Sequence, residues 1–205
     1  MSGRIALVAG PVLLAAGTAL VPDGVGARHG SDLAKSRKVL EQVAPHRDLI
    51  PVSMLLLCVG FAAMIVAAVE LGSLAGHRRT SALAIALVTI GAASGIVGNS
   101  AAPMNLFRLT DPKLDPDVAA RSLAYENPIT FIGILLVLLL LVGFAILAVG
   151  GWRAGSFRGY VAALIGVGAF LGFLAGEGPI GALFTLPLLA GMALASRSPG
   201  RTRSQ

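Results

Sequence analysis

Six apolar blocks, each long enough to cross a bilayer, limit the folds open to this chain. They cover residues 5–21, 50–75, 81–102, 129–150, 159–175 and 179–196. A helix needs about 20 apolar residues to cross the hydrocarbon core, and in lipid its backbone groups must bond to one another. With 13% charged residues, the chain lacks the polar side chains that cover a water-facing surface. We predict an all-α polytopic membrane helical bundle with six transmembrane helices.

The whole chain, 1–205, is predicted to form a single integral membrane domain with a basic cytoplasmic tail at 197–205. We expect the first block to remain as a span, because no small-x-small cleavage site follows it closely. The charged residues behind the net charge of +6 lie between and beyond the apolar blocks, as membrane topology requires. We therefore do not expect nucleic acid as a partner. Arginines without acidic residues fill the short segments at one side of the blocks, namely Arg4, Arg78, Arg79, Arg153, Arg158, Arg197, Arg201 and Arg203.

The longer segments on the other side hold equally many Lys and Arg residues, but they also hold nearly all the acidic residues. The positive-inside rule counts Lys and Arg, so the two sides tie by number. The arginines of the short segments are denser and closer to the helix ends. We therefore predict a multi-pass protein of the bacterial plasma membrane with both termini in the cytoplasm.

An internal repeat is predicted from similar hairpins at 5–75 and 81–158. The sequence VGFA occurs at 59–62 and again at 142–145. When Pro22 is aligned with Pro103, Gly10 and Gly17 correspond to Gly91 and Gly98. A third, shortened hairpin would cover 159–196. Both copies begin on the same side, unlike the inverted repeats of many transporters. Chance similarity between Ala, Gly and Leu-rich helices is the alternative.

The two long outer segments carry amphipathic patterns. In the first, Ser31 or Asp32 can cap a helix, and Pro45 ends it. In the second, the helix begins at Pro116 and stops at Pro128. We predict two amphipathic helices lying on the outer membrane face, with irregular loops as the alternative.

Three features together resemble a known type of protein. They are the helix spacing, the first outer segment with its run Val39-Leu40-Glu41-Gln42-Val43-Ala44-Pro45-His46, and the Gly151-Trp152-Arg153 turn after the fourth block. In these the chain is similar to the small six-helix membrane proteins of high-GC bacteria that are grouped as domains of unknown function. The resemblance implies a membrane-embedded bundle and no particular activity.

Few residues in or near the spans can carry chemistry, and ionisable groups there are the first suspects because a charge in lipid is costly. Glu70 lies near the inner end of the second block and forms a candidate inner carboxylate, or simply an interfacial ion pair. A possible outer polar patch would bring together Glu177, Asn99, Glu126, Arg108 and His46. Separate helix-end caps and solvated ion pairs explain the same residues.

Glycines at four-residue spacing predict close helix packing. They are Gly91 and Gly95 in the third block, and Gly168, Gly172 and Gly176 in the fifth. We expect them to pack inside one molecule, although a face between two copies is the alternative and a homo-oligomer is possible.

No metal site or cofactor is predicted. The three histidines are far apart, and the single cysteine excludes an intrachain disulfide. The partners expected are the lipid bilayer and either a bound lipid or another membrane subunit.

Three classes of function follow. We favour a non-enzymatic protein that binds a lipid or small molecule, or a small subunit of a membrane complex. The alternative is an intramembrane enzyme acting on a lipid or isoprenoid, with Glu177 or Glu126 as general acid and Asn99 orienting the substrate. A transporter ranks third, because its pathway needs polar residues at mid-membrane.

Overall fold

The computed structural model describes residues 3–22, 32–76, 78–124, 128–174 and 178–198, and every regular element in these ranges is helical. The α-helices are α1 Gly3–Leu20, α2 Leu33–Val43, α3 Leu49–Ala75, α4 Arg78–Leu109, α5 Pro116–Ala124, α6 Pro128–Arg153, α7 Gly159–Leu174, α8 Gly178–Phe184 and α9 Leu186–Ser196. A short 3₁₀ helix, Ala44–His46, joins α2 to α3. The predicted all-helical fold class is therefore confirmed.

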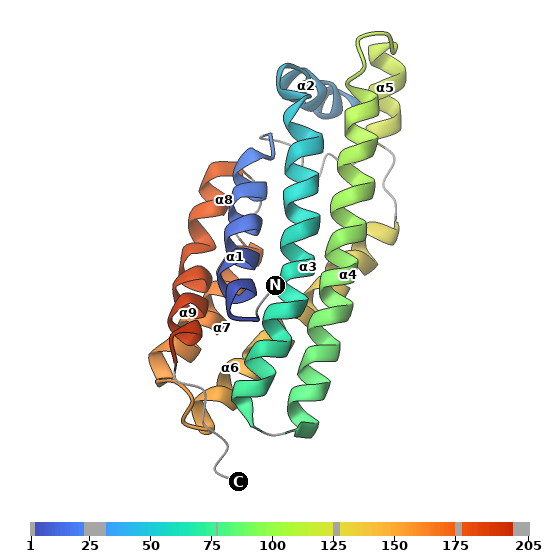
Figure 1. The fold of residues 1–205 in the computed structure, drawn as a ribbon. Helices are drawn as coiled ribbons and strands as arrows, with labels where there is room; N and C mark the ends of the chain where they lie inside the picture. The colour runs from blue at the N-terminus through green and yellow to red at the C-terminus, as the bar shows by residue number, and fades with distance from the viewer. Residues whose placement is uncertain (1–2, 23–31, 77, 125–127, 175–177, 199–205) are drawn as a thin grey trace.

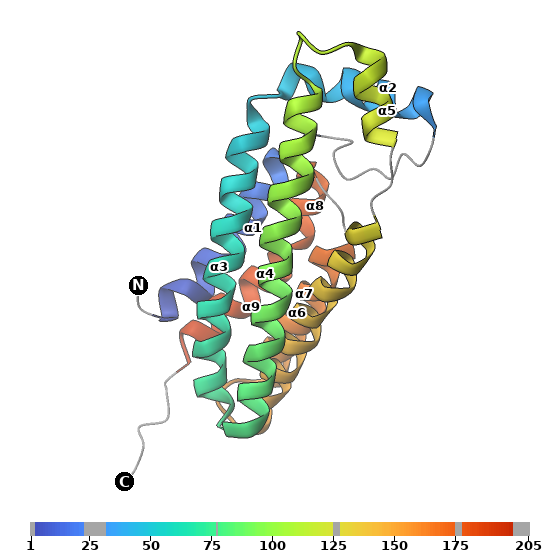
Figure 2. The same ribbon diagram turned by 90° about the vertical axis from the view of Figure 1, so that its right-hand side faces the viewer.

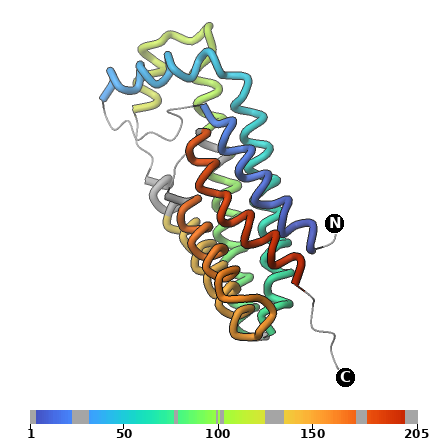
Figure 3. The backbone as a smooth tube through the Cα atoms, turned by 90° about the vertical axis from the view of Figure 1, so that its left-hand side faces the viewer, coloured from blue at the N-terminus to red at the C-terminus, as the bar shows by residue number. Residues whose placement is uncertain are grey.

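The long helices form a closed ring. Going around it, α1 contacts α3, α3 contacts α4, α4 contacts α6, α6 contacts α7, and α7 contacts α9. Both α8 and α9 return to contact α1 (Figure 3). Helix α3 also contacts α6 across the ring. Each pair α1–α3, α4–α6 and α7–α9 comprises two helices that follow one another around this ring.

Apolar side chains from α1, α3, α4, α6, α7 and α9 fill the centre of the ring. Its fully buried members include Leu7, Met64, Phe144, Ile165 and Met192. In such a close-packed core, dispersion contacts between apolar side chains stabilise the packing of the helices. In the part of the chain that the structure describes, the buried polar side chains are only Ser36, Ser53, Ser81, Thr110 and Thr185.

The helices of the pairs α1–α3, α4–α6 and α7–α9 cross each other at the same kind of reciprocal contact. A glycine on each helix faces an aliphatic residue of the other, and each of these aliphatic residues lies three positions before a glycine of its own helix. The facing residues are Gly17 with Leu57 and Gly60 with Leu14, then Gly91 with Leu140 and Gly143 with Val88, then Gly168 with Leu188 and Gly191 with Ile165. At Gly91 and Gly168 an added methyl group would overlap the backbone of the facing helix, so only glycine allows this approach.

This contact differs from the predicted correspondence between hairpins. By packing, Gly17 corresponds to Gly91, whereas the sequence alignment on the two prolines paired Gly17 with Gly98. A methyl group at Gly98 would meet nothing within 4 Å. Pro22 and Pro103 are not equivalent positions, because α4 continues past Pro103 to Leu109.

Helix α4 is longer than the predicted span, which ended at residue 102. It continues through Pro103 to Leu109, so it is 32 residues long. Proline removes one backbone hydrogen bond and bends a helix. Packing contacts made by residues after the proline can nevertheless stabilise the continuing helix. Here Leu106 is buried beyond the proline, in a second apolar cluster. The predicted sixth span is interrupted instead: α8 ends at Phe184 and α9 starts at Leu186, with Pro187 in its first turn.

Among the residues that the structure describes, four segments are long and apolar enough to cross a membrane, and two shorter apolar helices accompany them. The four are Leu49–Ala75, Arg79–Leu109, Leu135–Arg153 and Pro179–Ser196. The shorter ones are Arg4–Leu20 and Gly159–Gly172. A membrane protein is therefore the class that the fold indicates.

Helices α3 and α4 rise above the ends of α1 and α8 and carry α2 and α5 at their tips (Figure 1). Seen from the side, α2 and α5 lean out over the ends of the other helices (Figure 2). We call α2, the 3₁₀ helix, α5 and the adjoining ends of α3 and α4 the cap.

Candidate functional site

The cap helices begin at aspartates that bind their first free N–H groups. Asp32 precedes α2, and its Oδ1 accepts hydrogen bonds from the N–H groups of Ala34 at 3.0 Å and Lys35 at 3.2 Å. Asp115 does the same for α5, accepting from Asp117 N–H at 2.8 Å. These bonds satisfy backbone donors that a helix start leaves unpaired. The bond from Lys35 is the main cause that holds the pKa of Asp32 below its ordinary value.

The cap has an apolar core of its own, separate from the core of the ring. Its buried members are Val39, Leu40, Val43, Ile50, Leu106, Ala119 and Ala120. They come from α2, α3, α4 and α5, so one side of each amphipathic cap helix packs against the other helices of the cap. The two predicted amphipathic helices are thus present. They pack against each other and against α3 and α4.

Arg47 connects the start of α3 to the end of α4. Its guanidinium lies 4.4 Å from the centre of the Phe107 ring, and its Nη2 lies 3.4 Å from Asp111 Oδ2. The Asp111 carboxylate also accepts a hydrogen bond from Lys113 N–H at 2.9 Å. This bond first, and the positive charge of Arg47 next, hold the pKa of Asp111 below its ordinary value.

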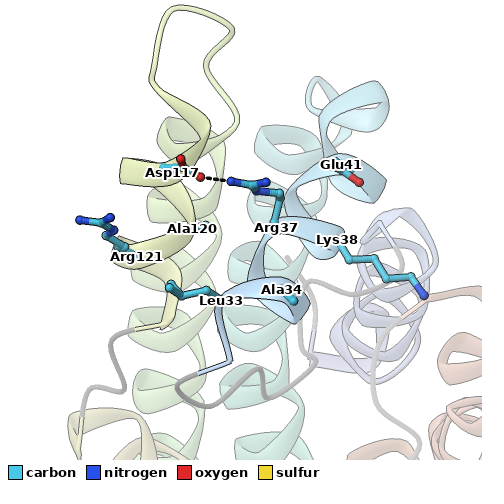
Figure 4. A pocket seen from close by; sticks show the side chains of 8 residues that line it. All are labelled: Leu33, Ala34, Arg37, Lys38, Glu41, Asp117, Ala120 and Arg121. Atoms are coloured by element: carbon cyan, nitrogen blue, oxygen red, sulfur yellow. Dashed lines mark hydrogen bonds and ion pairs between the residues drawn. The ribbon is translucent and has the colours of Figure 1, made fainter.

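A groove of about 660 Å³ opens between α2 and α5 (Figure 4). One stripe of α2 and one of α5 line it, with Leu33, Ala34, Arg37, Lys38, Glu41, Asp117, Ala120 and Arg121. Arg37 forms an ion pair with Asp117 across the two helices. Because the lining combines aliphatic carbon with both signs of charge, the groove can hold an amphipathic ligand with a charged end.

The predicted outer polar patch falls mostly outside the described residues. Glu126 and Glu177 lie outside them, as does the side chain of Asn99. His46 and Arg108 are described and both are exposed on the cap. No hydrogen bond or ion pair joins these two among the side chains whose positions the structure gives.

Glu70 is half-buried near the end of α3 that lies opposite the cap. Among the side chains that the structure describes, its carboxylate has no ion pair. The nearby basic residues with which it could form the interfacial ion pair are Arg78, Arg79 and Arg153, and the side chain of Arg78 is not described.

The predicted packing glycines lie at helix contacts where they are described. Gly91 faces Leu140, Gly95 faces the Phe61 ring, and Gly168 and Gly172 face the α8–α9 region at Leu188 and Thr185. Gly176 lies outside the described residues. Within the described part of the chain no group of three His, Cys, Asp or Glu side chains could hold a metal ion.

Sequence reasoning missed the residues that build the cap, namely Arg37, Arg47, Asp111 and Asp117. A signal for them existed in the charges. Both ion pairs between the outer segments join a cation of the first segment to an aspartate of the second. Such complementarity indicates that the two segments contact each other, but not which residues pair.

Comparison with protein-family models, with curated proteins and with solved structures finds no match for the chain.

Proposed function

We propose that the chain is a non-enzymatic integral membrane protein that binds a lipid or another small amphipathic molecule through its cap. The observation that carries the proposal is the groove between α2 and α5. The groove has a volume of about 660 Å³ and lies open at the surface of the cap. Its lining offers both apolar contact and charged groups, as an amphipathic ligand requires.

The apolar interior of the ring, in the part of the chain that the structure describes, supports binding over transport. The buried polar side chains of the described residues are serines and threonines without a titratable group. Ser53, Thr110 and Thr185 donate to carbonyl groups of their own helices or the adjoining turn. A transport pathway needs polar groups at mid-membrane.

We further infer that six segments cross the membrane as three hairpins derived from one repeat. The two shorter helices α1 and α7, with 18 and 16 residues, are about 27 and 24 Å long. That length is close to the hydrocarbon thickness of about 30 Å, especially where neighbouring helices thin the bilayer locally. The reciprocal glycine contact in each of the three hairpins supports the repeat.

Native mass spectrometry of the protein released from lipid nanodiscs, without denaturation, tests the binding function. We expect the protein to retain one lipid or small molecule in stoichiometric amount. Release of the bare protein would contradict the proposal. Release with a stoichiometric second protein and no ligand would also contradict it, and would favour a role as a subunit.

A further inference from the structure

We propose that the turn between α6 and α7 binds the phosphate groups of anionic lipids through the side chains of Arg153 and Arg158. Figure 1 and Figure 3 show this turn at the end of the bundle opposite the cap, so the proposal goes beyond the binding function of the groove. It rests on the proposed crossing of the membrane by α6 and α7, and on the charge, the conformation and the aromatic side chains of the turn.

Positive charge without acidic neighbours distinguishes this end of the bundle. Arg79, Arg153, Arg158 and Arg197 are exposed there, at or beside the ends of α4, α6, α7 and α9. In the part of the chain that the structure describes, the ion pairs all join residues of the cap segments, so none of these arginines takes part in one. From residue 128 to 174, the stretch that holds α6 and α7, the sequence has no acidic residue. The two arginines of the turn are therefore available to an anion from outside the chain.

Hydrogen bonds hold the turn in one conformation. Gly155 adopts the left-handed conformation, with a φ of 71°, and its N–H donates to the Trp152 carbonyl at 2.9 Å. The Ser156 N–H donates to the Gly151 carbonyl at 2.9 Å, which completes the pattern with which a glycine ends a helix. The Ser156 hydroxyl also donates to the Leu74 carbonyl of α3 at 2.6 Å. Because the backbone beside both arginines is fixed in this way, binding a ligand has less of the chain to order.

The turn lies where two apolar helices end. A segment long and apolar enough to cross a membrane ends at Arg153, and a shorter apolar helix starts at Gly159, so only residues 154–158 separate them. Trp152 and Tyr160 lie at these two helix ends and are 52% and 53% exposed. Exposed Trp and Tyr side chains concentrate where the apolar core of a bilayer meets the headgroups. With α6 and α7 as spans, the two arginines between these rings reach the headgroup layer.

Phosphate is the anion that suits these residues. A planar guanidinium can donate two parallel hydrogen bonds to one phosphate, whereas a lysine ammonium acts as a point charge. The turn carries arginines alone, while the three lysines of the chain, Lys35, Lys38 and Lys113, all belong to the segments of the cap. Each arginine can bind a phosphate of its own. A zwitterionic lipid holds a cation beside its phosphate, so both arginines should prefer an anionic lipid, which is the kind that makes the cytoplasmic leaflet negative.

The fluorescence of Trp152 tests the proposal on the full-length protein, because this residue is the only tryptophan of the chain. A methyl group at Gly159 would lie 3.2 Å from Trp152 Nε1, so the indole lies against the residue that follows Arg158. The protein is reconstituted in vesicles of phosphatidylglycerol mixed with phosphatidylcholine, and only one of the two lipids carries bromine on its acyl chains. Bromine quenches a tryptophan that it contacts. Exchanging which lipid is brominated gives the ratio of the binding constants of the two lipids beside the turn.

The test variant is Arg153→Gln with Arg158→Gln. The matched control is Arg108→Gln with Lys113→Gln, which removes the same charge from exposed positions at the cap end of the bundle. We expect the wild type and the control to prefer phosphatidylglycerol, and the preference of the test variant to be lower by about tenfold or more. The reason is that each cation near an anionic surface strengthens binding about fivefold. Arg153→Lys with Arg158→Lys should keep a preference, which separates loss of charge from loss of fold.

Absence of quenching by either brominated lipid would show that the turn does not contact lipid, and would contradict both this inference and the crossing of the membrane by α6 and α7. Quenching with equal lipid ratios in the wild type and the test variant would overturn the assignment of Arg153 and Arg158 while leaving the crossing in place.

Soluble competitors distinguish the lipid from other anions. A preference abolished by millimolar glycerol phosphate, but not by sodium chloride of the same ionic strength, would show that the arginines bind soluble phosphate compounds. The same effect of polyglutamate would assign the turn to an acidic protein partner. Either result would overturn the choice of a lipid ligand.

Discussion

At the scale of single residues, Arg47 is the side chain on which the cap depends most. It contacts both a ring and a carboxylate of the segment around the end of α4, and its buried Nε has no hydrogen-bond partner among the described residues. This half-buried side chain therefore joins the first outer segment to the second, beside the apolar core of the cap. Elsewhere in the cap the polar contacts are exposed, and exposed ion pairs contribute little.

Replacing Arg47 by Met should loosen the cap without unfolding the ring. The change keeps the aliphatic stem and removes the contact with the Phe107 ring, which is worth about 1 kcal/mol in such settings. Amide hydrogen exchange in α5 should then become about fivefold faster, as measured by mass spectrometry of the detergent-solubilised protein. Arg108→Met, at an exposed position of the same region, is the control and should leave exchange unchanged. Equal rates in both variants would contradict this role of Arg47.

The Asp111 carboxylate makes the cap sensitive to acid. Its pKa is lower in the folded cap than in an unfolded chain, chiefly because Lys113 N–H donates to it and also because Arg47 is near. Its contribution to stability is therefore present above the unfolded value, about pH 4, and is lost as the pH falls below that value through the folded pKa. We expect exchange in α5 to accelerate over this range.

Asp111→Asn should reduce the acid-dependent part of that change, because the amide does not titrate. The comparison needs exchange rates corrected for the intrinsic effect of pH at each step. A variant that keeps the full acid response would show that other carboxylates of the cap, such as Asp32, cause it.

At the scale of elements, the reciprocal glycine contacts explain how the helices of each hairpin pack so closely. The third hairpin offers a matched pair for testing them. A methyl group at Gly168 would overlap the backbone at Pro187 and Leu188, whereas one at Gly166, on the same helix, would meet nothing within 4 Å.

Gly168→Ala should lower the free energy of unfolding by about 1–3 kcal/mol, the usual cost of forcing extra volume into a packed contact. Gly166→Ala should leave it unchanged or raise it by less than about 1 kcal/mol, since alanine favours the helix. Unfolding in mixed micelles of increasing denaturing detergent measures both. Equal effects of the two substitutions would show that the close crossing of α7 and α9 does not limit stability.

Most of the elements could be predicted from the sequence, but several boundaries and all the cap contacts could not. Apolar blocks reveal a helix because lipid leaves the backbone no other partner. The helix end predicted at Pro103 was wrong, because α4 is stabilised beyond it by contacts between Leu106 and residues far away in the chain. The pairing of Arg37 with Asp117 joins residues 80 positions apart. Nothing local in either segment specifies it.

At the scale of the whole molecule, the three hairpins are not equivalent. The first two carry the helices α2 and α5 between their long helices, while in the third α7 and α8 are separated only by residues 175–177. The first two hairpins are therefore joined twice, within the ring and again through the cap, whereas the described part of the third takes part only in the ring. A ligand held in the cap would thus act on the relation between the first two hairpins.

Cysteine labelling can decide on which side of the membrane the cap lies. In a Cys58→Ser background, Ala34→Cys should react with a membrane-impermeant maleimide added to intact cells, because Ala34 is exposed in the cap and the dense arginines of the opposite end favour the cytoplasm. Thr80→Cys, at that opposite end, should react only after lysis. The reverse pattern would invert the predicted topology. It would also assign the groove to the cytoplasmic leaflet, whose surface potential is negative.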